Sequence, residues 1–195
     1  MNFLAHILLS GSEPDIQVGG LLGDFIKGPL KGQCPSKVEQ GIRLHRHLDA
    51  YMDELPVMGE LLTLFPKPWR RYGGIVIDVG FDHLLARDWL RFHQQELKPF
   101  CQAFYTHLET HRAWLPDNAR HFCDRAPAIG WLEGYVDADI IPAVLNRVGE
   151  RFRTPIPLAD AWPIVAQHQA DFEYGFGEIM MALTQRAEES LNGSI

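Results

Sequence analysis

Apolar residues recur three or four positions apart along most of the chain, which is the spacing of amphipathic helices. One such stripe predicts a helix from Ser36 to about Asp53, and Ser36 and Glu39 together fit a capping box with Ser36 as the N-cap. Unusually, the stripe also includes polar residues; its members are Val38, Ile42, His45, Asp49 and Met52.

Two further helices are predicted downstream. Pro99 opens the first, because apolar and aromatic positions then recur at helical spacing as far as His111. Asp160 would cap the second, which has Pro163 in its first turn and runs toward Leu191.

Alternating strand patterns are nearly absent. The run GGIVIDV at 73–79 is apolar enough for a buried strand, but it continues directly into a helical pattern. The region 116–157 is the least regular, and no repeat or interdomain linker interrupts the chain. We therefore predict an all-α fold, a helical bundle forming one domain over 1–195.

Composition limits the classes of protein that fit. A chain of 195 residues with 46% hydrophobic residues can build one sizeable core. Three widely spaced cysteines favour neither a disulfide framework nor a zinc ribbon, so we expect a reducing, cytoplasmic setting. No segment has the length and apolarity of a membrane span, and the first residues lack a basic leader. A net charge of −7 argues against a general nucleic-acid binder.

Basic residues nevertheless gather in two segments. Between Ile26 and Arg46 the chain has five basic residues and one acid, Glu39, and the segment 67–71 adds three more. Such a patch is either a solvated helix face or a surface that attracts an anionic partner. The basic residues are Lys27, Lys31, Lys37, Arg43, Arg46, Lys67, Arg70 and Arg71.

Acidic residues and a histidine interrupt the apolar stretch IDVGFDHL at 77–84. Asp78 and Asp82 are four residues apart, so on a helix they share a face, with His83 beside them. Two like charges in apolar surroundings repel each other, which a divalent cation such as Mg²⁺, Mn²⁺ or iron would relieve. The alternative is that Asp78 caps the helix and Asp82 pairs with a nearby arginine, Arg87 or Arg71.

Three other apolar stretches contain polar side chains of the same kinds. Asp24 lies within GLLGDFIKG, His6 within FLAHILL, and His45 and Asp49 share the stripe of the 36–53 helix. Each can be a cap or a hydrogen-bonded core group, or part of a site. No P-loop, GxSxG elbow or HExxH motif is present. The chemistry that needs this set of Asp and His residues is metal-dependent hydrolysis.

Four motifs in order resemble those of the acyl carrier protein phosphodiesterases: MNFLAH, GLLGDFIKG, GIRLHRHLDAYMD and IDVGFDHLLARDW. The resemblance extends weakly through LPDNARHF, WLEGY and the C-terminal helix. That family is similar to the HD-type metal-dependent phosphohydrolases with a permuted motif order. The chain departs from the pattern at Gly23, where relatives have a bulkier small residue, and at His47.

The resemblance implies hydrolysis of the bond between 4′-phosphopantetheine and holo acyl carrier protein, with Mn²⁺ or Mg²⁺ as cofactor. We expect the metal at Asp24, Asp78, Asp82 and His83. We expect catalytic roles for His6, His45, Arg46 and Asp49, as further ligands, acid–base groups, phosphate contacts or, for Asp49, a group that orients His45. Substrate contacts are expected from Lys27, Arg43, Arg70 and Arg71, which would dock the acidic carrier, and from Phe172 and Phe176, either as core or as a groove wall for the pantetheine arm.

Two other functions remain open on the residues alone. A metal phosphohydrolase acting on a nucleotide or another small phosphate ester needs the same side chains. A non-enzymatic helical binding protein would use the polar residues as satisfied core pairs. Metal content separates the binding protein from both enzymes, and product analysis separates the two enzymes.

Overall fold

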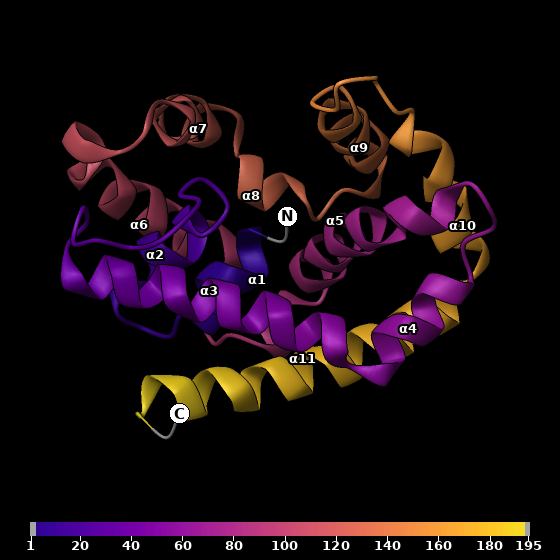
Figure 1. Ribbon diagram of the computed structural model, residues 1–195, viewed down its shortest axis with the longest axis horizontal. Helices are drawn as coiled ribbons and strands as arrows, with labels where there is room; N and C mark the ends of the chain where they lie inside the picture. Colours follow the sequence, from indigo (N-terminus) through magenta and orange to yellow (C-terminus); the bar gives the residue numbers. More distant parts are fainter. Residues whose placement is uncertain (1–2, 194–195) are drawn as a thin grey trace.

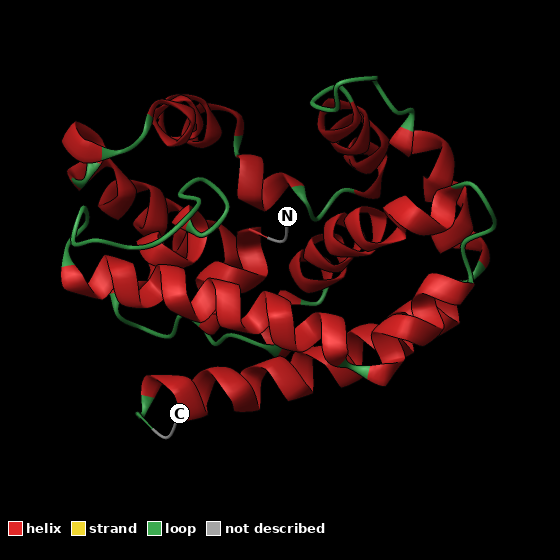
Figure 2. Ribbon diagram, viewed as in Figure 1, coloured by secondary structure: helices red, strands yellow, loops and turns green. Residues whose placement is uncertain are grey.

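The computed structural model describes residues 3–193, and this part of the chain is helical without a β-strand (Figure 2). The predicted all-α class is confirmed. The α-helices are α1 (Phe3–Leu9), α2 (Pro14–Leu22), α3 (Ser36–Glu54), α4 (Pro56–Thr63), α5 (Gly73–Arg87), α6 (Leu97–Thr110), α7 (Asp117–Ile129), α8 (Trp131–Gly134), α9 (Ile141–Gly149), α10 (Trp162–Gln167) and α11 (Gln169–Leu191). Short 3₁₀ turns are η1 (Trp69–Tyr72), η2 (Trp89–Arg91), η3 (Arg112–Trp114), η4 (Ala138–Ile140) and η5 (Leu158–Ala161).

The first two predicted helices form close to their expected bounds, but the predicted cap does not. Helix α3 has Pro35 as its N-cap, and no side chain bonds the first turn. The carboxylate of Glu39 instead accepts a hydrogen bond from the backbone N–H of Gly32, at 2.8 Å. The capping-box prediction was therefore wrong, because Glu39 reaches back to the preceding loop.

Two other expectations need correction. The helix predicted from Asp160 is divided at His168, whose backbone angles (φ −113°, ψ 33°) are not helical, and Asp160 lies in η5. The region described as irregular contains α7, α8 and α9. Proline near the end of α7 and a left-handed Gly130 (φ +59°) divide it into pieces too short to show a long periodic pattern.

Helix α3 crosses the molecule with α1 and α2 on one side of it, while the long α11 runs beside it (Figure 1). Beyond α1 and α5, helices α7 and α8 lie on one side of the molecule and helix α9 lies on the other (Figure 1). Among the described residues α2 and α3 share the most extensive contact. Glycine makes that contact possible: a Cβ on Gly19 would lie 2.2 Å from the carbonyl oxygen of Val38, and one on Gly41 would lie 2.1 Å from that of Ile16.

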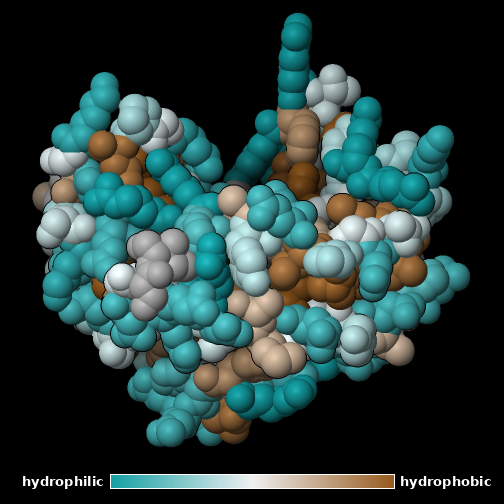
Figure 3. Space-filling model, turned by 60° about the horizontal axis from the view of Figure 1, so that its bottom comes forward, coloured by the Kyte–Doolittle hydropathy of each residue, from teal (hydrophilic) through white to brown (hydrophobic). Residues whose placement is uncertain are grey.

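Hydrophilic residues cover most of the face in Figure 3, with hydrophobic patches between them. Within residues 3–193 no helix combines the length and the apolarity that crossing a bilayer requires.

Replacing Gly41 by alanine tests the α2–α3 contact. Because the new methyl group meets backbone rather than a flexible side chain, we expect Gly41→Ala to lower the free energy of unfolding by about 3 kcal/mol, the upper end of the usual cost of overpacking. Gly177→Ala is the matched control, since a Cβ there meets nothing within 4 Å and should stabilise α11 by up to about 1 kcal/mol. Equal effects of the two changes in urea unfolding would contradict the close contact.

Candidate active site

Two buried histidines from different helices stack on each other and share one carboxylate. The ring of His6, on α1, lies 3.7 Å from the ring of His45, on α3, at an interplanar angle of 29°. Asp49 follows His45 by one helical turn, so its side chain lies on the same face of α3. Its two oxygens face the two rings: Oδ1 lies 2.9 Å from Nε2 of His6, and Oδ2 lies 3.2 Å from Nε2 of His45.

Helix α2 supplies the wall against which His45 is held. The Nδ1 atom of His45 lies 2.7 Å from the carbonyl oxygen of Gly20. A Cβ on Gly20 would lie 2.8 Å from the carbonyl oxygen of His6, and a Cβ on Gly23 would lie 2.2 Å from the ring of His45. A larger residue than Gly23 would therefore displace the ring of His45.

Hydrogen-bond chemistry fixes which nitrogen of His45 carries a hydrogen. A carbonyl oxygen only accepts, so Nδ1 of His45 must carry the hydrogen that it donates to Gly20. In neutral His45 the Nε2 atom then presents a lone pair to Asp49, and two acceptors face each other across 3.2 Å. Either a second proton on the ring or a cation between the two groups resolves this conflict.

The ionisation of this group suits a positively charged ligand. Burial opposes ionisation of Asp49, but hydrogen bonds with His45 and His6 outweigh it and hold the pKa of this carboxyl well below its usual range. Burial, followed by the neighbouring His45, lowers the pKa of His6. Near neutral pH the site therefore combines an ionised carboxylate with a neutral His6.

Two buried polar atoms at this site lack a hydrogen-bond partner within the described residues: Nδ1 of His6 and Oδ2 of Asp24. Unsatisfied buried acceptors are rare and call for an explanation. The ligand atoms of His6, His45 and Asp49 lie within 4.8 Å of one another, close enough to hold one cation. Imidazole and carboxylate donors together suit Mg²⁺, Mn²⁺ or iron, so the donor set fits the expected cofactor.

Further carboxylates surround this group. Burial raises the pKa of Asp53, and the charges of Asp78 and Asp49 raise it further, so Asp53 lies within electrostatic range of both. Asp78 is half-buried in the middle of α5 and does not cap that helix. Asp24, whose charge acts on His6, borders the His6–His45–Asp49 group, and Asp78 lies near Asp53; the role of Asp24 and Asp78 as metal ligands stays a prediction.

The other two expected ligands, Asp82 and His83, hydrogen-bond to the backbone. Both oxygens of the fully buried Asp82 accept backbone hydrogen bonds at the start of α1, from Leu4 at 3.1 Å and Ala5 at 3.2 Å. Burial raises the pKa of Asp82 to about 7. His83 lies with Nδ1 2.8 Å from the carbonyl oxygen of Tyr135, to which it donates. Asp82 thus holds α1 on α5 and His83 holds the chain after α8, while their role as metal ligands stays a prediction.

The predicted arginines mostly contact the protein itself. Arg46 donates to the carbonyl oxygens of Ile26 and Gly28 and so fastens the loop after α2. Arg70 donates to backbone carbonyls of Phe65 and Thr63. Arg46 is therefore placed to position the loop that contains Asp24 rather than to contact a reacting group.

The remaining expected docking residues differ in how freely they are exposed. Arg71 lies over the ring of Tyr72, and Arg43 is 3.4 Å from Glu39. The ammonium group of Lys27 lies at the surface, 3.7 Å from Oδ1 of Asp24. Of the four, Lys27 is the one that the structure brings to the candidate active site.

The two predicted groove residues are core. Phe172 and Phe176 are 1% and 3% exposed. Phe172 packs edge-on against Phe65, and Phe176 packs against Phe81 and Phe92. Of the two roles expected for them, core or groove wall, the structure supports the core.

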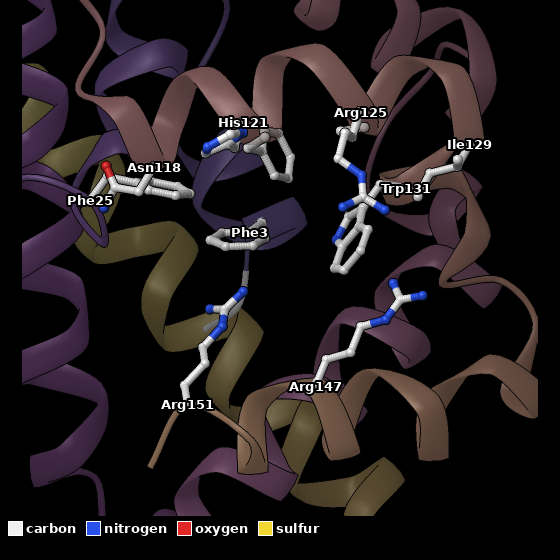
Figure 4. Close-up of a pocket in the computed structure, with 11 residues that line it drawn as sticks. Phe3, Phe25, Asn118, His121, Arg125, Ile129, Trp131, Arg147 and Arg151 are labelled. Carbon is white, nitrogen blue, oxygen red and sulfur yellow. The ribbon is translucent and has the colours of Figure 1, made fainter. Parts of the chain in front are cut away.

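A cleft that the sequence did not indicate lies beside the site, between α7 and α9 (Figure 4). Its cavity volume is about 280 Å³. Figure 4 shows Arg125 on the α7 side and Arg147 and Arg151 on the α9 side, with the ring of Phe3 between the two sides. Within residues 3–193 none of the three arginines forms an ion pair. The cleft therefore has an aromatic floor and an uncompensated positive rim.

The cleft and the histidine pair are built by the same two segments. Phe3 lies one turn before His6 on α1, and Phe25 directly follows Asp24. The rings of Phe3 and Phe25 stack with centroids 5.8 Å apart and form part of the floor. A ligand in the cleft would lie against residues directly connected to the candidate active site.

Comparison with known proteins agrees with the motif order. A family model described as acyl carrier protein phosphodiesterase matches residues 1–183. The acyl carrier protein phosphodiesterase of Pectobacterium atrosepticum is 30% identical to this chain, covering 96% of this chain and 98% of the relative. That of Salmonella agona is 34% identical, covering 90% and 92%, and that of Yersinia pestis is 32% identical, covering 89% and 90%.

No solved structure matches the chain, so its likeness to HD-type phosphohydrolases stays a prediction. The family match spans both the histidine pair and the residues of the cleft. The chain belongs to the acyl carrier protein phosphodiesterase family.

Proposed function

We propose that the chain hydrolyses the phosphodiester between 4′-phosphopantetheine and the serine of holo acyl carrier protein. The products are apo acyl carrier protein and 4′-phosphopantetheine. The observation that best supports a hydrolytic centre is the pair of stacked imidazoles sharing Asp49, with a lone pair of His45 directed at that carboxylate. Membership of a family of that name supplies the substrate.

We assign the binding of Mn²⁺ or Mg²⁺ to His6, His45 and Asp49, with Asp24 at the border of the group. When bound, such a cation activates water and neutralises charge on phosphoryl oxygens. The ionised Asp49 supplies the negative charge that a cation requires. His45 is held by Gly20 in the tautomer that leaves Nε2 free to bind.

The protonation of His6 bears on its role. Because burial lowers its pKa, His6 is neutral near pH 7 and has no extra proton to donate to the departing serine oxygen. Of the roles expected for it, binding a cation or accepting a proton fits better than acting as the general acid.

Lys27 is the cationic side chain that we assign to the phosphoryl oxygens. It is 74% exposed yet lies beside Asp24, and its flexible stem lets the ammonium group turn toward a bound phosphate. Arg46 supports this placement by holding Ile26 and Gly28 on either side of Lys27. Its contribution is to orient the loop.

We place the pantetheine arm in the cleft between α7 and α9. The arm has an apolar dimethyl segment that suits the floor of Phe3, Phe25 and Phe122. The carrier protein is expected to be acidic, so the rim of Arg125, Arg147 and Arg151 offers charge that complements it. This cleft takes the place of the groove expected at Phe172 and Phe176.

Removal of the cation should abolish hydrolysis. We expect chelator-treated protein to be inactive and to recover with Mn²⁺ or Mg²⁺, while Asp49→Asn and Asp24→Asn lower kcat/KM by about 100-fold or more. The measurement is the intact mass of the carrier after incubation with the enzyme. Full activity in metal-free protein would contradict the proposal.

Asp82→Asn is the matched control for these carboxylate variants. Its carboxylate holds α1, so the change should lower the free energy of unfolding by about 1–3 kcal/mol and leave the bound metal unchanged. If folded Asp82→Asn protein lost its bound metal, Asp82 would be a metal ligand after all.

Charge reversal in the cleft tests where the carrier binds. We expect Arg125→Glu/Arg147→Glu to raise KM for holo acyl carrier protein at least tenfold, and its effect to weaken as salt rises, because exposed charges are screened within about 10 Å at 0.1 M. Turnover of bis-p-nitrophenyl phosphate, which has no arm or carrier, should not change.

The control is Arg153→Glu, an exposed arginine near Arg151 that does not line the cleft. If it raised KM as much as the cleft variants, the effect would come from net charge alone and the cleft would not be the docking site.

A further inference from the structure

A second cluster of histidine and aspartate lies outside the candidate active site. His107 lies in the last turn of α6 and His111 is the C-cap residue of that helix, while Asp15 reaches both from the first turn of α2. Oδ1 of Asp15 is 2.8 Å from Nε2 of His107 and 3.0 Å from Nε2 of His111, and the two Nε2 atoms are 3.3 Å apart. Three potential ligand atoms thus converge from two helices.

The spacing of these atoms suits a small tetrahedral cation. With metal–ligand distances of about 2.0–2.2 Å, ligand atoms at a tetrahedral centre lie roughly 3.3 Å apart. The two Nε2 atoms already have this separation, and the carboxylate oxygen needs to move by only a few tenths of an ångström. Two imidazoles and one carboxylate are a donor set that Zn²⁺ commonly takes.

Without a cation, hydrogen bonds hold the cluster in an arrangement that is less favourable than one with a bound metal ion. For both histidines to donate to Asp15, each must carry a hydrogen on Nε2, and both hydrogens must point at one oxygen. The two N–H dipoles then lie side by side across 3.3 Å. A cation takes the place of both hydrogens and meets three lone pairs instead.

The cluster is accessible and its carboxylate is ready to bind. The exposed fractions of the side chains are 31% for His107, 13% for His111 and 29% for Asp15, so an ion and a water molecule as fourth ligand can reach them. Hydrogen bonds from His107 hold the pKa of Asp15 below its usual range, against the effect of burial, which keeps the carboxyl ionised at neutral pH.

We propose that Asp15, His107 and His111 form a second metal site, suited to Zn²⁺, that fastens α2 to α6. Helix α2 also supplies Gly20, whose carbonyl orients His45, and Gly19, which packs on α3. A cation at Asp15 therefore braces the helix that forms the wall of the candidate active site. The site is distinct from the hydrolytic centre, and its presence does not depend on the substrate of the enzyme.

Metal binding and thermal unfolding of the full chain test this site. After chelation, Zn²⁺ at about 100 times its dissociation constant should raise Tm by about 5–10 °C. His107→Gln/His111→Gln should lose one equivalent of bound Zn²⁺ and the corresponding part of the shift in Tm. Asp15→Asn should weaken binding at least tenfold, since even partners outside the first coordination shell contribute that much.

Cobalt distinguishes this site from the hydrolytic centre. Co²⁺ in a tetrahedral site absorbs visible light strongly, and this absorption should be absent in His107→Gln/His111→Gln and retained in Asp24→Asn. The control is His168→Gln, because His168 also pairs with an aspartate, Asp171, but has no second histidine beside it.

Equal Zn²⁺ content, Tm shift and Co²⁺ absorption in wild type and His107→Gln/His111→Gln would overturn the proposal. The cluster would then be only a hydrogen-bonded contact between α2 and α6. The two proposals can also be tested separately. If Asp49→Asn abolishes hydrolysis but the protein still binds one Zn²⁺ at Asp15, His107 and His111, the second site stands whatever the hydrolytic centre does.

Discussion

The close contact between α2 and α3 is the constraint on which the candidate active site depends. Gly19 and Gly41 let the two backbones approach within distances that no side chain would allow. That approach brings the Gly20 carbonyl to 2.7 Å from His45, fixes the tautomer of its ring, and lays the ring on that of His6. A small steric requirement in the core thus determines which nitrogen of His45 is free to bind a cation.

The surroundings of Asp49 and Asp82 shift the pKa values of these two carboxyl groups in opposite directions. Asp49 borders two imidazoles and stays ionised, so it is suited to a cation. Asp82 is fully buried, its pKa is raised to about 7, and its oxygens meet the first N–H groups of α1. Asp82 thereby anchors α1, the helix that contains His6. The surroundings therefore suit Asp49 to a cation and suit Asp82 to holding the start of α1.

The sequence predicted well what depends on periodicity and short motifs. It indicated the all-α class, helix α3 and the polar stripe of His45 and Asp49. It did not predict the hydrogen-bond partners of Asp82 and His83, because these partners are 78 and 52 residues away in the chain. The arginine cleft was missed because its lining combines segments that are far apart in the chain, from Phe3 to Arg151. HLETH at 107–111 has metal-ligand spacing, but its third member, Asp15, is 92 residues away.

The most direct test of the account is the position of the catalytic cation in a crystal structure with bound Mn²⁺. Anomalous scattering locates the ion independently of any assumption about its ligands. We predict a peak within coordination distance of Nε2 of His45 and of an oxygen of Asp49, with Asp24 at its border. A peak held by Asp82 and His83 instead, or none at the histidine pair, would contradict the claim that the α2–α3 contact builds the hydrolytic site.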